Sequence, residues 1–166
     1  MKRAFSLVEL MMVVALLGIL AAMAFPQFQS NTTDAKATTA KANLRVLRSA
    51  FELYTAQHNG VAPGYLDGNP LAVPNQTVMM NQLEKATTSA GAIAELGTVG
   101  YDRGPYLKRS PENPFNSRTD TKMLTNNEDF PQNATGQFGW IYHAATKTIK
   151  LDWPGTDKHG VRYYDY

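Results

Sequence analysis

The sequence predicts an α+β fold in which a long N-terminal helix packs against a small antiparallel β-sheet near the C-terminus. An apolar run from Phe5 to Phe25 is followed by apolar residues at helical spacing up to about residue 58. Two segments that alternate apolar and polar residues lie between residues 136 and 153. A chain of 166 residues is long enough for one domain plus an N-terminal segment.

The charge balance argues against a nucleic-acid partner. Of the 16 positive charges, Lys2 and Arg3 supply two, and the remaining 14 are matched by 14 acidic residues. A nucleic-acid-binding surface needs an excess of positive charge. No nucleic-acid partner is therefore predicted.

Catalytic motifs are lacking in the sequence. The chain has no cysteine, which excludes disulfides, thiolate metal sites and a cysteine nucleophile. Its three histidines are scattered without a metal-ligand partner at i+3 or i+4, so each is expected to be exposed or half-buried. Neither a G-x-S-x-G motif nor a glycine-rich phosphate loop occurs. No catalytic residue and no enzymatic activity are predicted.

The first 25 residues are predicted to form a membrane segment. The apolar run would form a helix of about 30 Å, which matches the hydrocarbon core of a bilayer. The basic flank predicts a cytoplasmic N-terminus and an exported remainder. Two alternatives are an ordinary signal peptide, cut after Ala22-Met23-Ala24, and a plain single-pass anchor. Glu9, a carboxylate at the edge of the apolar run, is unusual in either.

The stretch "KRAFSLVEL" resembles the processing site of type IV pilins and of the pseudopilins of type II secretion. In that family a basic leader and a small residue precede Phe-[Thr/Ser]-Leu-[Ile/Val]-Glu and a long apolar helix. The resemblance implies cleavage between Ala4 and Phe5, N-methylation of Phe5 and a pilin-like fold. Ala4 replaces the usual Gly. Gly18 and Pro26 stand where many members carry helix-weakening residues, and with Glu9 they are the predicted assembly residues.

The same resemblance implies a structural filament subunit and its partners. These are a prepilin peptidase that also methylates, sibling pilins or pseudopilins and further copies of the chain, and an assembly platform protein with its ATPase. The subunit would cross the bacterial inner membrane once, with its head outside the cytoplasm, before it enters a periplasmic or extracellular filament.

Glu9 can be explained by assembly. A charge at the centre of a spanning helix costs about 2.5–3.5 kcal/mol. Two opposite charges 4 Å apart attract by about 4 kcal/mol at an effective dielectric constant near 20. We expect Glu9 to be poorly satisfied in a free subunit, and to be neutralised by the Phe5 ammonium of a neighbouring subunit. The carboxylate would then set the register between subunits.

The second half of the helix is amphipathic. Leu44, Leu47, Phe51 and Tyr54 form one apolar stripe, and Asn59-Gly60 predicts the helix end. Four segments follow from this division. They are a leader (1–4), a transmembrane and assembly half (5–26), an amphipathic half (27–59) and a globular head with a C-terminal hairpin (60–166).

The middle of the head is harder to interpret. Short helices are expected within 75–86 and within 87–100, the second closed by Gly97. Three prolines make 104–120 a loop, and its "YLKRSPENPF" resembles a loop of the major, G-like pseudopilin, although Asn113 and Phe115 differ from the family's Asp and Trp. This loop, the "HNGVAP" helix exit and the absence of cysteine favour a G-like pseudopilin. A type IV pilin and a secreted soluble binding domain are the alternatives.

The C-terminal region predicts strands and, less directly, calcium. "GQFGWIYHA" and "KTIKLDW" form the expected hairpin, "GVRYYDY" is a candidate third strand, and the aromatic residues are expected in the core and at its rim. Asp152, Asp157 and Asp165 cluster in the C-terminal tail. Major pseudopilins hold calcium in this region, so Asp152 and Asp157 are calcium candidates. Surface acids in turns are the simpler explanation, and no other cofactor is predicted.

Overall fold

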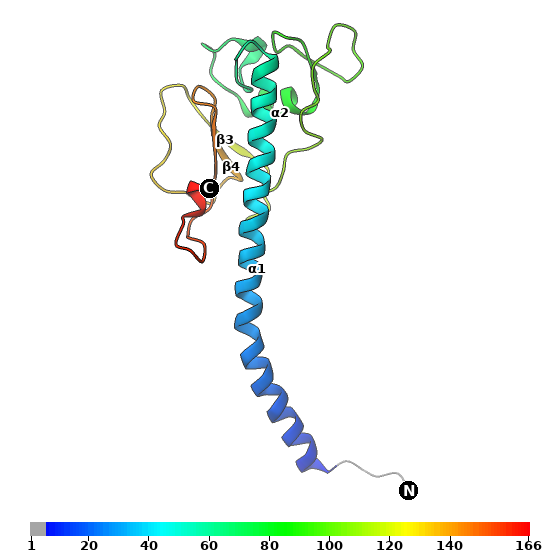
Figure 1. Cartoon of the computed structure of the whole chain (residues 1–166), viewed down its shortest axis with the longest axis vertical. Coiled ribbons are helices and arrows are strands. Elements are labelled where there is room, and N and C mark those ends of the chain that lie inside the picture. Colours follow the sequence, from blue (N-terminus) through cyan, green and yellow to red (C-terminus); the bar gives the residue numbers. More distant parts are fainter. Residues whose placement is uncertain (1–5) are drawn as a thin grey trace. The chain divides into compact units, whose positions relative to one another are not determined.

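A computed structural model describes residues 6–166 of the chain, apart from the side chains of residues 23–31 (Figure 1). The cleavage site at Ala4 and Phe5 lies outside the described residues. The chain divides into two compact units, with the boundary between Lys36 and Ala37. Each unit is described by itself below, and the second is called the head.

Helix α1 (Leu7–Gln57) crosses the boundary and remains helical at positions 18 and 26. Its end confirms the predicted stop. Asn59 and Gly60 have φ angles of 54° and 81°, the left-handed conformation that asparagine and glycine tolerate best. The Gly60 amide donates to the Thr55 carbonyl at 3.0 Å, which closes the last turn.

The core of the head forms on one face of α1. The predicted stripe of Leu44, Leu47, Phe51 and Tyr54 is buried, with no more than 3% of any of these residues exposed. The Phe51 ring packs against the Tyr142 ring with 4.5 Å between centroids. The amphipathic half of α1 therefore serves as one wall of the core.

A three-stranded sheet forms the other wall, in the order β3 (Thr121–Leu124), β4 (Trp140–His143) and β5 (Thr148–Leu151). Strands β4 and β5 form the predicted antiparallel hairpin. Strand β3 runs parallel to β4. All four β4 residues are buried, because one face packs in the α1 cluster and the other meets Leu124 and Tyr164. The α+β class is confirmed.

The expected third strand at 160–166 is wrong. This segment contains a short 3-10 helix, η2 (Tyr163–Asp165), and β3 takes the third place in the sheet. The Arg162 guanidinium pairs with the Asp165 carboxylate, three residues further on. A helical turn brings residues at this spacing together, whereas a strand separates them.

The connecting region contains one expected helix and one hairpin. Helix α2 (Gln76–Glu84) begins at Asn75, whose side chain accepts from the Thr77 amide at 2.8 Å. The second helix, expected within 87–100, is wrong, since β1 (Ala86–Thr87) and β2 (Ile93–Ala94) pair there instead. Between them Gly91 has φ 85°, a left-handed conformation that interrupts a helix. A 3-10 turn, η1 (Leu66–Gly68), precedes α2.

Candidate functional site

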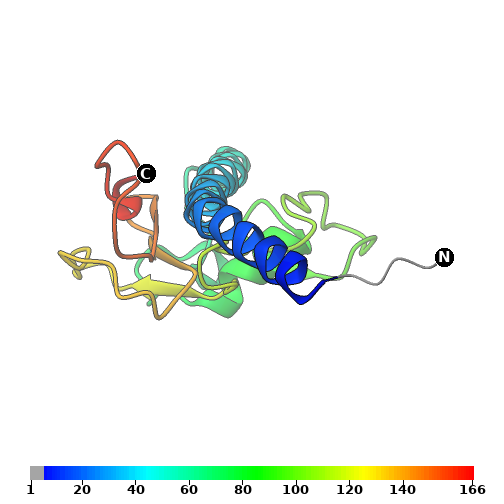
Figure 2. The same cartoon turned by 90° about the horizontal axis from the view of Figure 1, so that it is seen from below.

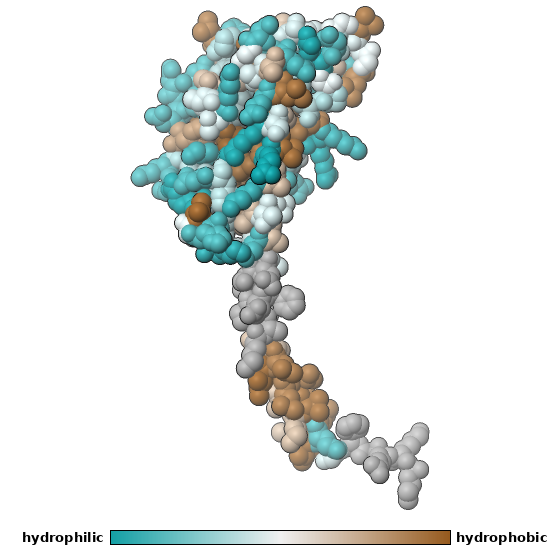
Figure 3. All heavy atoms as spheres, viewed as in Figure 1, coloured by the Kyte–Doolittle hydropathy of each residue, from teal (hydrophilic) through white to brown (hydrophobic). Residues whose placement is uncertain are grey.

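Large apolar side chains cover the start of α1, from Leu7 to Leu20. Every leucine, isoleucine, valine and methionine from Leu7 to Leu20 is between 48% and 73% exposed (Figure 3). A Cβ added at Gly18 would meet nothing within 4 Å. A helix that is apolar all round needs other apolar groups to cover it. Among the described residues, however, no helix combines the length and hydropathy that a membrane span requires.

Glu9 has a partner within its own chain. Its Oε2 accepts a hydrogen bond from the Ser6 amide at 3.0 Å, while the Ser6 hydroxyl accepts from the Val8 amide at 3.3 Å. Together these bonds form a capping box, which satisfies two backbone donors at the start of α1. Glu9 therefore receives one backbone hydrogen bond in a single chain, which does not neutralise its charge, and its poor satisfaction in a free subunit within a membrane stays a prediction. The sequence signal was the S-x-x-E spacing from Ser6 to Glu9.

The four other predicted processing and assembly positions differ in how much the structure shows of them. Ala4 and Phe5 are outside the described residues, and nothing is described of the Pro26 side chain. Gly18 lies within α1 and faces open space. The assembly roles of Glu9, Gly18 and Pro26 stay predictions.

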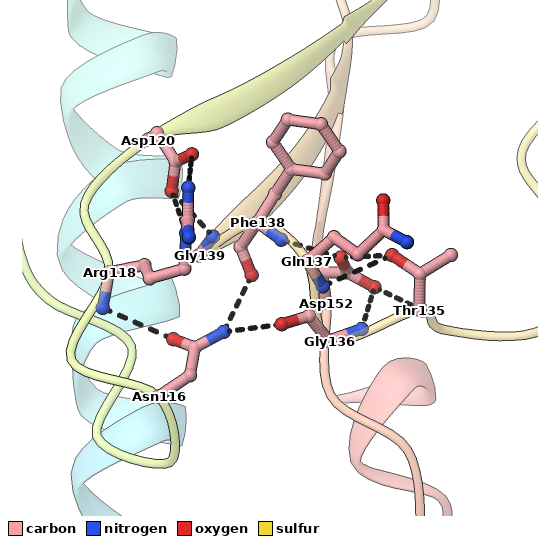
Figure 4. Close-up of polar contacts among 9 residues, drawn as sticks. All are labelled: Asn116, Arg118, Asp120, Thr135, Gly136, Gln137, Phe138, Gly139 and Asp152. Carbon is pink, nitrogen blue, oxygen red and sulfur yellow. Dashed lines mark hydrogen bonds and ion pairs between the residues drawn. The ribbon is translucent and has the colours of Figure 1, made fainter.

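Asp152 is the centre of a polar network in the head (Figure 4). It is fully buried, and its carboxylate accepts from the Thr135 amide at 2.6 Å and the Thr135 hydroxyl at 2.8 Å. The amides of Gly136 and Phe138 donate to the same carboxylate at 3.1 and 3.0 Å. The expectation of a surface acid is wrong for Asp152, because it organises the loop that leads into β4.

The loop with three prolines joins this network through its polar residues. The Asn116 amide group donates to the carbonyls of Gly136 and Phe138 at 3.1 and 2.9 Å. The Asp120 carboxylate accepts a hydrogen bond from the Gly139 amide at 3.2 Å. It also accepts hydrogen bonds from Nε and Nη2 of Arg118, at 2.9 and 2.6 Å. The hydrogen bond from Arg118 lowers the pKa of Asp120 below its usual value. Loop and sheet are thus connected by side chain to backbone contacts.

Asp157 holds the C-terminal turn. Its carboxylate accepts from the amides of His159 and Val161 at 2.9 and 3.0 Å, and from the Tyr166 hydroxyl at 2.9 Å. Lys41 of α1 reaches the same group at 3.5 Å. Burial alone would raise the pKa of Asp157, but these hydrogen bonds outweigh it and lower the pKa to about 2.

These hydrogen bonds affect how available Asp152 and Asp157 are as calcium ligands. Residues 6–166 hold no cluster of three or more His, Asp or Glu side chains suited to a metal ion. A calcium ion at Asp152 or Asp157 would have to displace N–H and O–H donors from the oxygens it needs as ligands. The two candidate carboxylates therefore fit a structural role better than a metal site.

His58 lies at the end of α1 and is only 2% exposed, so the expectation of an exposed or half-buried ring is wrong. Its Nδ1 lies 2.7 Å from the Tyr54 carbonyl, which only accepts, so Nδ1 carries the proton. Its Nε2 then accepts from the Thr87 hydroxyl at 3.0 Å. Burial lowers the pKa of His58, and the positive charge of Arg103 adds to this effect.

Comparison with known proteins supports the same interpretation of the N-terminus. The model of the prokaryotic N-terminal methylation motif matches residues 1–25. Over 111 residues the chain is 44% identical to type II secretion system core protein G of Pseudomonas aeruginosa, covering 67% of this chain and 66% of that relative. It is also 45% identical to a fimbrial protein of Pseudomonas aeruginosa over 114 residues, covering 64% of this chain and 74% of the relative.

The chain belongs to the type IV pilin and pseudopilin superfamily. A further relative is the type IV major pilin protein PilE1 of Neisseria gonorrhoeae, 32% identical over 106 residues, which cover 62% of this chain and 48% of PilE1. No solved structure matches the chain. As a member of this superfamily, the pilin-like chain is a pilin or pseudopilin subunit.

Proposed function

We propose that the chain is a G-like pseudopilin, a structural subunit of a type II secretion filament rather than an enzyme. Its similarity to core protein G of Pseudomonas aeruginosa supports this choice. The left-handed Asn59-Gly60 helix exit and the absence of cysteine agree with it. The fimbrial relative supports a second candidate, a subunit of a type IV pilus.

Before assembly, the subunit is held in the inner membrane with its head outside the cytoplasm. The prepilin peptidase cuts between Ala4 and Phe5 and methylates the new amine. The platform protein and its ATPase then pass the subunit to copies of itself and to sibling pseudopilins. The matching methylation motif over residues 1–25 supports this sequence of events.

One observation supports the assembly step above all. The first turns of α1 are apolar on every side and carry one carboxylate, Glu9, at their start. In a single chain this carboxylate is held by the Ser6 amide. During assembly the methylated Phe5 ammonium of a neighbouring subunit replaces that amide. An ion pair in a low-dielectric helix bundle then fixes the register.

N-terminal analysis of the mature protein tests the processing. Mass spectrometry of the membrane-extracted protein should show a first residue Phe5 that carries one methyl group. A mature chain that begins at Phe25 would point to an ordinary signal peptide and would refute the proposal.

Deletion of the gene separates the two filament types. Loss of secreted proteins with normal surface pili supports the pseudopilin. Loss of surface pili with normal secretion supports the type IV pilin instead.

The Glu9→Ala substitution is expected to leave cleavage and membrane association unchanged while filament yield falls by at least about tenfold, since a lost ion pair of this kind costs more than 1.4 kcal/mol. Sedimentation of sheared filaments measures the yield. Ser6→Ala is the matched control, because it removes the Ser6 hydroxyl from the capping box but keeps the carboxylate. Equal filament yields from wild type and Glu9→Ala would refute the assembly role.

A further inference from the structure

The C-terminal segment, residues 152–166, lies beside the part of α1 that belongs to the head (Figures 1 and 2). Two basic side chains of α1 reach Tyr166 in this segment. The Lys41 ammonium lies 3.9 Å from the centre of the Tyr166 ring, and the Arg48 guanidinium donates a hydrogen bond to the Tyr166 carbonyl. Side chains of the helix therefore hold this segment in place.

The Lys41 ammonium has two partners in the segment, a carboxylate and an aromatic ring. Besides the Tyr166 ring it contacts Oδ2 of Asp157 at 3.5 Å. The Asp157 side chain is only 5% exposed, and the Tyr166 hydroxyl donates to the same Oδ2 at 2.9 Å. An ammonium group is attracted both by a carboxylate and by the face of an aromatic ring. Asp157 and Tyr166 together thus form a site for an organic cation.

Donors from four residues surround the Asp157 carboxylate. A carboxylate offers about four acceptor positions, two on each oxygen. The amides of His159 and Val161 take the two positions of Oδ1. The Tyr166 hydroxyl and the Lys41 ammonium take those of Oδ2. The negative charge of Asp157 is therefore met by a cation that the chain itself supplies.

Tyr166 also ends a row of packed aromatic rings. Its ring meets the Tyr163 ring edge to face, with 5.6 Å between centroids. Tyr163 packs on Phe115 at 4.6 Å, and Phe115 stacks on Trp153 at 5.5 Å. Because Phe115 belongs to the loop with three prolines, the contact at Lys41 connects α1 to that loop through the C-terminal segment.

We propose that Lys41 is the cation that fastens the C-terminal segment to α1, in place of the calcium ion expected at Asp157. The contacts of Lys41 with Asp157 and Tyr166 are called the Lys41 clamp here. The ring face of Tyr166 suits an ammonium group but gives a calcium ion no oxygen ligand. The comparison with calcium rests on the proposed function, because calcium was expected for a G-like head.

Limited proteolysis of the full chain in detergent tests the clamp. Endoproteinase Lys-C cuts after Lys158, in the turn that Asp157 holds, when this turn opens locally. Lys41→Met keeps an apolar side chain without the charge, and is expected to speed this cut at least about fivefold. Lys41→Arg keeps a cation and should cut at the wild-type rate. Mass spectrometry of the released C-terminal peptide measures the rate.

Lys36→Met is the matched control, since it removes an exposed lysine from the same helix and should leave the rate unchanged. Tryptophan fluorescence verifies that every variant is folded. Equal rates for wild type and Lys41→Met would overturn the clamp. A Lys41→Arg variant that is cut as fast as Lys41→Met would also overturn it, because the charge would then contribute nothing.

Calcium tests the same proposal from the side of the metal. Lys-C cleavage after Lys158 is measured with EDTA and with millimolar calcium. The wild-type rate should be the same in both, because Lys41 already supplies the cation. A wild-type rate that calcium lowers and EDTA raises would assign a metal ion to the turn and overturn the proposal.

The proposed function fails separately from the clamp. A mature chain that begins at Phe25 would remove the filament and leave the rates of cleavage after Lys158 as expected. Methylated Phe5 together with equal rates for wild type and Lys41→Met would keep the pseudopilin and remove only the clamp.

Discussion

Two buried polar residues, Asp152 and His58, show how single side chains organise this head. Each was expected near the surface, and each is buried with its hydrogen-bonding groups paired. A buried polar group without partners costs about 1–3 kcal/mol. The loop around each of these two residues therefore depends on the hydrogen bonds of that one side chain.

Asp152→Asn is expected to lower the free energy of unfolding by about 2–4 kcal/mol, because an amide group presents a donor to backbone N–H groups. Urea denaturation, followed by the fluorescence of Trp140 and Trp153, measures the change. Asp165→Asn is the matched control. It breaks exposed ion pairs with Arg162 and Lys150 and should cost much less stability than Asp152→Asn. Similar losses in both variants would contradict the scaffold role of Asp152.

The lowered pKa of His58 predicts that the protein loses stability in weak acid. Above pH 6.5, the ordinary pKa, the ring is neutral in both states and stability does not depend on it. Below pH 6.5 the unfolded chain binds a proton that the folded chain, with its lowered pKa, does not yet bind. Stability then falls by up to about 1.4 kcal/mol per pH unit until the folded pKa is reached.

The urea midpoint measured from pH 8 to pH 5 tests this, and His58→Gln should flatten the slope in that window. Asp157 contributes to stability in a separate, more acidic pH range. Its pKa of about 2 gives stability that is present above its ordinary pKa of 3.8 and is lost as the pH falls toward 2. A wild-type slope that His58→Gln leaves unchanged would assign the weak-acid loss to other groups.

At the scale of elements, two backbone segments approach closely at the entry into β4. A Cβ built on Gly139 would lie 2.4 Å from the Arg118 carbonyl oxygen. Gly139 also donates its amide to the Asp120 carbonyl at 3.0 Å. This close approach lets β3 leave the loop with three prolines and run parallel to β4.

Gly139→Ala is expected to destabilise the head by about 1–3 kcal/mol, since the backbone on one side must move. Gly18→Ala is the control, because its Cβ meets nothing within 4 Å and the residue is helical. Thermal unfolding followed by circular dichroism distinguishes the two. A Gly139→Ala variant as stable as wild type would mean that the junction relaxes without cost.

Local sequence patterns predicted the elements that local interactions specify. The apolar stripe through Leu47 and Phe51 and the Asn59-Gly60 stop predicted α1 and its end, and alternation predicted the β4–β5 hairpin. Strand β3 was missed because its four residues are held by parallel pairing with a strand that begins 16 positions after its own end, at Trp140. The role of Asp152 was missed because its donors are 14 to 17 residues away in the chain.

At the scale of the whole molecule, the two units differ in whether their apolar side chains are buried. The head buries its own apolar core and satisfies its loops with its own carboxylates. The first unit exposes apolar side chains from Leu7 to Leu20. The head therefore has an apolar core of its own, whereas the apolar side chains from Leu7 to Leu20 are left uncovered in the single chain.

Calcium provides a test at this scale. Since Asp152 and Asp157 already accept N–H and O–H donors, EDTA or millimolar calcium should leave the melting temperature of the full chain in detergent unchanged. Differential scanning calorimetry measures it. A rise in melting temperature with calcium that Asp152→Asn abolishes would show that the donors can be displaced.

The capping box at Ser6 and Glu9 has one more consequence. Under the proposed assembly, a Glu9 carboxylate oxygen leaves the Ser6 amide for a neighbour's ammonium, so that entry into the filament exchanges one hydrogen bond within the chain for one ion pair between chains.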